Sequence, residues 1–172
     1  MKTNKRPPYS VYPHVSNEKV ALRKIINSDI NAIIEISFYD AIQAISLEQA
    51  IEMNSKIDDD YDNSNSIHWG IIDNQTNEIV GTCGYYRGFH KDQGELGCVL
   101  LPQYRGKGFM TDAMLLAIDF GFKNIGLKRI FAVTSKQNDK AIRLLERIGF
   151  KKNSELQENE VEYELIAAKR HY

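Results

Sequence analysis

The chain has 172 residues, of which 42% are hydrophobic and 26% are charged, a composition typical of one folded globular domain and not of a disordered chain. Its formal net charge of −1 argues against a nucleic acid or a charged membrane surface as a direct partner. No stretch approaches the roughly 18 apolar residues that span a bilayer. The N-terminus also lacks the apolar run of a secretory signal, so we expect a cytoplasmic protein.

The first 18 residues are polar and contain three prolines, so we expect residues 1–18 to form an N-terminal arm and residues 19–172 to form a single domain. Within that domain, an alternating apolar pattern predicts a first strand from Lys19. A helix follows, and Ser28 and Asp29 are the residue types that cap helix N-termini.

A second helix opens with the capping-box pair Ser46 and Gln49 and is predicted to end near Met53. The polar run Lys56–Ser66 comes next and carries four aspartates, which favours a solvated loop.

The centre of the chain is rich in strand-forming residues. Predicted strands at Ile67–Asp73, Glu78–Tyr86 and Gly94–Leu101 are joined by short polar turns, which indicates an antiparallel meander. The hydrophobic period then becomes helical over residues 109–124.

The last third of the chain alternates between the two periods. A strand at Lys128–Thr134 precedes a helix at Asn138–Ile148, which Gly149 ends as a left-handed residue. The final strand is Glu160–Ala167, with room for a short strand at 150–155. The whole pattern predicts one mixed α/β domain.

The two cysteines, Cys83 and Cys98, are too few for a disulfide framework and lack the spacing of a metal site. We therefore expect a reducing compartment and no bound metal. Strand alternation places Cys98 on the opposite face from Glu95, so we interpret it as a small buried apolar residue and not as a nucleophile.

A short loop with two glycines connects a strand that ends at Leu101 to the helix that begins at Phe109. Glycine allows a tight turn and a close approach of the backbone to a ligand. The first N–H groups of a helix lack intrahelical partners and carry partial positive charge, so they favour an anion such as a pyrophosphate. The residues of this candidate phosphate loop are Arg105, Gly106, Lys107, Gly108, Phe109, Met110 and Thr111.

Two other phosphate motifs do not fit the loop. A Walker A loop would need glycine at Leu101 and serine or threonine at Gly108, and a dinucleotide fingerprint would need glycine at Thr111. The remaining alternative is an ordinary strand–helix turn whose glycines serve geometry alone.

With these residues the sequence resembles the GCN5-related N-acetyltransferase (GNAT) superfamily, and within it the RimJ/RimL-like branch that acetylates ribosomal-protein N-termini. The family's cofactor signature is Arg or Gln, two residues, Gly, one residue, then Gly or Ala. Arg105–Met110 matches all of it except the last position. The downstream residues Asn138 and Gly149–Phe150 also match. The resemblance implies a single mixed, mostly antiparallel sheet of six to seven strands, flanked by helices and splayed at the cofactor site.

The same resemblance implies acetyl-CoA as co-substrate, with its pantetheine arm paired to the backbone of Cys98, Val99 and Leu100 and a further contact from Asn138. A backbone N–H of that strand would polarise the thioester carbonyl. The acceptor amine must lose a proton before attack, so a general base is needed. Branch members often carry a glutamate at the position of Glu95, which is our candidate base.

The usual general acid of the family, a tyrosine seven residues after the asparagine, is replaced by Leu145. Water, Ser135 or another tyrosine could donate instead, or no acid is needed. The resemblance suggests a protein N-terminus as acceptor, with a small amine such as a polyamine, amino sugar or antibiotic as the alternative. Leu145 and Met110 also leave open a non-catalytic CoA-binding regulatory module. We expect a monomer or homodimer.

Three aromatic residues, Trp69, Tyr85 and Tyr86, could line the acceptor pocket, although core packing is the simpler interpretation for at least half of them. The acidic run Asp58–Asp62 lies where the family builds its acceptor site, and its charge could attract a basic acceptor instead of only facing solvent.

Overall fold

The computed structural model describes residues 5–168, which fold around one eight-stranded sheet. Its strands are β1 (Val15–Ser16), β2 (Val20–Arg23), β5 (Ile67–Asp73), β6 (Ile79–Tyr86), β7 (Gln93–Leu100), β8 (Arg129–Ser135), β9 (Lys151–Glu155) and β10 (Glu160–Ile166). The helices are α1 (Asn27–Ile30), α2 (Leu47–Asp62), α3 (Phe109–Phe120) and α4 (Asp139–Arg147), and a separate hairpin pairs β3 (Phe38–Tyr39) with β4 (Ile42–Gln43).

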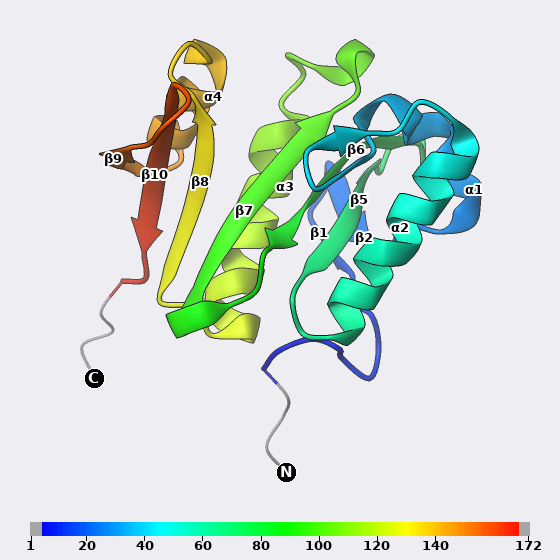
Figure 1. Ribbon diagram of the computed structural model, residues 1–172, viewed down its shortest axis with the longest axis horizontal. Helices are drawn as coiled ribbons and strands as arrows, with labels where there is room; N and C mark the ends of the chain where they lie inside the picture. Colours follow the sequence, from blue (N-terminus) through cyan, green and yellow to red (C-terminus); the bar gives the residue numbers. More distant parts are fainter. Residues whose placement is uncertain (1–4, 169–172) are drawn as a thin grey trace.

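The strand order across the sheet is β1-β2-β5-β6-β7-β8-β10-β9, and all neighbours are antiparallel except β7 and β8. The parallel pair is joined only where Gln93–Glu95 meets Arg129–Phe131, and the two strands then diverge (Figure 1). The predicted mixed, mostly antiparallel sheet with splayed strands is therefore confirmed. The sheet has one strand more than the expected maximum of seven, because the N-terminal arm adds β1, while β9 is the short strand expected near 150–155.

Different helices cover the two faces of the sheet: α2 lies over one face and α3 over the other (Figure 1). The α3 side holds the larger core, in which Ala113 and Ala117 are fully buried. These small side chains let the helix lie close to β6, where the Tyr85 hydroxyl donates a hydrogen bond of 2.7 Å to the Ala117 carbonyl. Burying a large apolar side chain stabilises a fold by about 1.5–3 kcal/mol, so this layer contributes much of the stability.

Helix α2 extends well beyond the predicted end near Met53 and includes most of the run interpreted as a loop, so that prediction is wrong. Its start is as predicted, because the Ser46 side chain accepts a hydrogen bond from the Gln49 N–H. The helix continues through the aspartates because Tyr61 is buried against the core while the charged side chains remain at least partly accessible to solvent.

The start of the first helix also differs from the prediction. Ile26 occupies the N-cap position of α1, and Asp29 lies three residues later with its carboxylate accepting from the Ile26 N–H at 2.9 Å. The same carboxylate receives two hydrogen bonds from Arg23. The aspartate therefore closes the helix start from inside the first turn and does not cap it from outside.

The described part of the N-terminal arm packs on the domain. Pro7 is fully buried, and the Tyr9 N–H donates to the Tyr61 hydroxyl of α2 at 2.9 Å. The Tyr9 ring also meets Phe120 of α3 edge-on, with centroids 5.9 Å apart. Because arm and domain share this packing, the boundary at residue 18 stays a prediction.

Cys83 and Cys98 are directly opposite each other on β6 and β7, and the structure pairs their sulfur atoms in a disulfide. The interpretation of Cys98 as a small buried apolar residue is therefore wrong, because the residue is disulfide-bonded and only partly buried. Sequence spacing did not show this pairing because it depends on the register between the two strands.

Candidate functional site

The phosphate loop has the backbone conformation that its glycines predicted. Gly106 and Gly108 both have left-handed φ values, +75° and +85°, and Gly108 is the N-cap residue of α3. A Cβ at Gly106 would meet no protein atom within 4 Å, so the surface of the loop is open. Arg105 and Lys107 are exposed beside it.

The first turn of α3 directs backbone N–H groups at this open surface. The first intrahelical bond from the helix start runs from the Asp112 N–H to the Gly108 carbonyl, so the amides of Phe109, Met110 and Thr111 precede the helical ladder. Phe109 is buried and Met110 packs against the core. The bulk of Met110, which departs from the family signature, is therefore partly accommodated by the core.

Two basic residues stabilise the loop and the first turn of α3. Lys19 directly precedes β2. Its ammonium group donates to the Lys107 carbonyl and lies 5.1 Å from the centre of the Phe109 ring. Arg147 of α4 donates to the Thr111 hydroxyl at 3.2 Å. These contacts fix the loop and the helix start, as a preformed anion site requires.

Asn138 follows β8 and is the N-cap residue of α4, where its side-chain oxygen accepts from the Ala141 N–H at 3.2 Å. The oxygen therefore has a structural role, and the side-chain amide group stays on an exposed surface. Leu145, which stands where the family has a tyrosine, is buried in the core with 4% of its surface exposed.

The strand that carries Cys98, Val99 and Leu100 is paired on one side only. β6 pairs with it from Glu95 to Leu100, whereas the pairing with β8 ends at Glu95. Among the described residues, the opposite backbone edge of Leu96–Leu100 has no strand partner, as an extended ligand that pairs with backbone groups would need.

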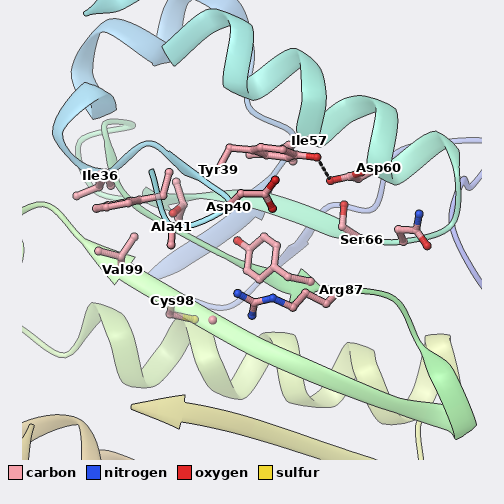
Figure 2. Close-up of a pocket in the computed structure, with 15 residues that line it drawn as sticks. Ile36, Tyr39, Asp40, Ala41, Ile57, Asp60, Ser66, Arg87, Cys98 and Val99 are labelled. Carbon is pink, nitrogen blue, oxygen red and sulfur yellow. Dashed lines mark hydrogen bonds between the residues drawn. The ribbon is translucent and has the colours of Figure 1, made fainter. Parts of the chain in front are cut away.

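A pocket of about 690 Å³ lies between α2, the β3–β4 hairpin and the neighbouring face of β6 and β7 (Figure 2). Gly97 and Val99 of β7 line it, as does Arg87 at the end of β6. The other lining residues are Ile36, Phe38, Tyr39, Asp40, Ala41, Ile57, Asp60, Asn65, Ser66, Thr82, Tyr86 and Cys98.

Glu95 lies on the same face of β7 as Gly97, at the edge of this pocket and outside its wall. Its carboxylate accepts from the Arg87 guanidinium at 2.6 Å, and this hydrogen bond raises the pKa of Arg87. The Glu95 side chain is 17% exposed, against 73% for Arg87. No other side-chain hydrogen bond to Glu95 is found within residues 5–168, so its second carboxylate oxygen has no side-chain donor there.

Comparison with known proteins identifies the family. The family described as "Acetyltransferase (GNAT) domain" matches residues 19–151. An uncharacterized N-acetyltransferase of Bacillus subtilis strain 168, YoaA, is 30% identical over 156 residues, which are 86% of this chain and 88% of the relative. The chain belongs to the GNAT acetyltransferase family.

Two solved structures of this GNAT fold are similar over nearly the whole chain. The ribosomal-protein-S5-alanine acetyltransferase of Vibrio fischeri has a TM-score of 0.75 at 22% identity and covers 90% of this chain and 96% of its own. A spermidine N-acetyltransferase of Vibrio cholerae has a TM-score of 0.74 at 20% identity, covering 87% and 95%. At these identities the similarity establishes the fold and does not choose an acceptor.

As a GNAT acetyltransferase, the protein is an acyltransferase of a family that uses acetyl-CoA as the acetyl donor. The phosphate loop fits that donor, since left-handed glycines and unpaired helix amides leave an open, positively polarised surface. Within the described residues, no cluster of His, Cys, Asp or Glu is suited to hold a metal ion, and no helix is long and apolar enough to span a membrane.

The three aromatic residues proposed for the acceptor pocket of this GNAT domain separate into two groups. Trp69 and Tyr85 are fully buried in the core. Tyr86 lines the pocket, and its hydroxyl is hydrogen-bonded to Nδ1 of His68. Burial lowers the pKa of His68 to about 4 and raises that of Tyr86, so both are neutral at physiological pH. The space left by Gly97 is used by the Tyr86 ring, which would lie 3.1 Å from a Cβ there.

Several pocket residues gave no signal in the sequence. Asp40 and Ala41 form the tip of the β3–β4 hairpin with left-handed φ values, although neither is a glycine. Ser66 precedes β5 and Arg87 follows β6, and their burial depends on the register in which these strands pair. Asp60 and Ser66 belonged to the polar run that was interpreted as a solvated loop, and Tyr86 had been named as a candidate for the pocket.

Proposed function

We propose that the protein transfers the acetyl group of acetyl-CoA directly to a small primary amine that binds in the pocket between α2 and β7. The observation that carries this proposal is the position of the pocket. It reaches Gly97–Val99, the part of β7 whose other edge lacks a strand partner among the described residues and could pair with the cofactor. Donor and acceptor would thus meet at one strand from opposite sides.

In this proposal Arg105–Thr111 hold the pyrophosphate, Cys98–Leu100 pair with the pantetheine arm, and the Asn138 amide adds a contact. Bound acetyl-CoA supplies an activated thioester. A backbone N–H of β7 stabilises the charge that develops on its carbonyl oxygen during attack.

Glu95 acts as general base. An alkyl ammonium group has a pKa of about 10.4 and must lose a proton before its nitrogen can attack. Because Glu95 stands at the edge of the pocket, we propose that the proton reaches it through one water. Arg87 holds the carboxylate at 2.6 Å and fixes its orientation.

The leaving thiolate has no tyrosine at position 145, where Leu145 is part of the core. A thiol pKa of about 8.5 makes the thiolate a tolerable leaving group without a dedicated acid. We therefore propose that solvent protonates it after the transfer.

A protein N-terminus is a second candidate acceptor, favoured by the similarity to a ribosomal-protein acetyltransferase. The named spermidine enzyme favours a small amine to the same extent. The Vibrio cholerae spermidine enzyme is dodecameric, and the monomer or homodimer expected for this chain stays a prediction.

The test mixes the purified protein with acetyl-CoA and a panel of small amines and N-terminal peptides, and follows release of free thiol. Acetylation of small amines is the expected result. Turnover on peptides alone would replace the acceptor, and binding of acetyl-CoA with no turnover on any amine would support the regulatory module instead.

A further inference from the structure

The acceptor pocket has two chemically different ends. The end at β7 is formed by Gly97, Cys98 and Val99. The other end lies beneath the second half of α2, where Asp60 and Ser66 are close together and away from Val99 (Figure 2). A molecule that presents an amine to β7 therefore extends toward a polar end.

Ser66 is the polar group at this end that the protein leaves unpartnered. It is 3% exposed, and within residues 5–168 its Oγ finds no hydrogen-bond partner. An unpaired buried hydroxyl costs about 1–3 kcal/mol, so such a group calls for a specific explanation. Because Ser66 lines the pocket with its side chain directed toward α2, a bound molecule can supply the missing partner.

The carboxylate of Asp60, beside Ser66, indicates that this missing partner is positively charged. Tyr39 donates to its Oδ2 at 3.0 Å, and this bond raises the pKa of the tyrosine hydroxyl, which therefore stays a donor. The other carboxylate oxygen accepts no side-chain hydrogen bond in the described part of the chain. Asp60 also forms no ion pair there, although the Lys56 Nζ lies over the Tyr39 ring, 5.6 Å from its centre.

The remaining charged residues of the pocket wall strengthen this polarity. Asp40, at the tip of the hairpin, is a second carboxylate without an ion pair among residues 5–168. The single basic residue of the described wall, Arg87, is already neutralised by Glu95. The pocket is therefore net negative at the end remote from the reacting strand.

We infer that Asp60 and Ser66 bind a second ammonium group of the acceptor, so that the substrate is a diamine whose other primary amine reaches β7. This inference rests on the proposed function. An ammonium group has three donors, which suit a carboxylate, the Ser66 oxygen and a neighbouring acceptor.

The test compares kcat/KM for a series of α,ω-diamines with that for n-alkylamines of the same chain lengths. A charge-assisted pair should give the best diamine an advantage of roughly tenfold or more over its monoamine. Asp60→Asn and Ser66→Ala should each lower kcat/KM much more for the diamine than for the monoamine, so that most of that advantage is lost. Equal wild-type values for diamine and monoamine, or equal losses on both, would overturn the inference.

Two controls show whether a lost diamine preference comes from the subsite itself or from a general change in charge or stability. Asp59→Asn removes an exposed charge from the neighbouring position of α2 and should preserve the diamine preference. Ser66→Ala removes an unsatisfied buried hydroxyl, so its melting temperature should not fall. If no amine is acetylated, the proposed function fails, and calorimetry of diamine binding to the wild-type protein and to Asp60→Asn still decides the subsite.

Discussion

The phosphate loop and the acceptor pocket are built in opposite ways. The loop is one continuous segment, Arg105–Thr111, whose shape follows from two glycines and the start of a helix. The pocket is assembled from segments separated by up to about sixty residues, and its key polar contact joins Tyr39 to Asp60. A local site is specified by its own residues, whereas an assembled site depends on the packing of the sheet and α2. The acceptor side can therefore change between relatives while the donor side stays constant.

The largest effect is expected at the point where the two regions meet. Glu95→Gln keeps the hydrogen bond to Arg87 and removes the proton acceptor, so kcat should fall by on the order of a hundredfold to ten-thousandfold. Affinity for acetyl-CoA, measured by calorimetry, should be nearly unchanged. Glu155→Gln makes the same substitution at an exposed carboxylate of β9 that pairs with Lys136 and Lys152, and it should retain full activity. Unchanged turnover in Glu95→Gln would remove this residue from the mechanism.

The assembled pocket should make stability sensitive to acid through His68. The pKa of His68 in the folded protein is about 4, below the ordinary 6.5. Between these two pH values the imidazole is protonated in the unfolded chain and neutral in the native protein. Stability that is complete above pH 6.5 is lost as the pH falls toward 4, by about 2 kcal/mol at pH 5. Urea unfolding of the wild type and His68→Asn at pH 7 and pH 5 measures this difference. Parallel losses in the two proteins would contradict it.

Substitutions in the phosphate loop should weaken acetyl-CoA binding without disturbing the acceptor pocket. Gly108→Val forces a branched residue into a left-handed conformation and places side-chain atoms against Lys19. We expect acetyl-CoA affinity to fall roughly tenfold or more. Gly126→Val introduces the same backbone strain, at φ +77°, on the far end of the α3 segment. If both variants bind acetyl-CoA equally well, the phosphate-loop assignment is wrong.

The smallest effect is expected on the stability of α2, the helix that covers the pocket. Ser46→Ala removes the cap of α2 and should lower the free energy of unfolding by about 1 kcal/mol. Ser55→Ala changes an exposed position within the same helix and should not destabilise the protein. Chemical denaturation distinguishes the two, and equal stabilities would show that the cap contributes nothing.

The sequence predicted what depends on neighbouring residues. The strands of the meander, the helices near 109–124 and 138–148, and the turn at Gly106–Gly108 all follow from local periodicity and backbone preference. The end of α2 was missed because only Ile57 and Tyr61 mark its inner face amid aspartates, and single apolar residues give a weak helical signal.

The acceptor pocket could not be predicted for a different reason. The burial of Ser66 and the position of Asp40 depend on which segments the sheet brings together, and no local pattern encodes them. The cysteine pair has the same origin, since Cys83 meets Cys98 only through the register of β6 and β7. The roles of Glu95 and Asn138 stay predictions that the experiments above can test.

Tyr9, in the described part of the N-terminal arm, packs against the helices that border both proposed binding sites. One tyrosine touches Tyr61, the neighbour of Asp60, and Phe120, at the far end of the helix whose start forms the phosphate loop. A substitution at Tyr9 would therefore alter the packing of α2 and of α3 at the same time. In directed evolution, this segment is a place to adjust how the two binding steps depend on one another while the reacting groups are left intact.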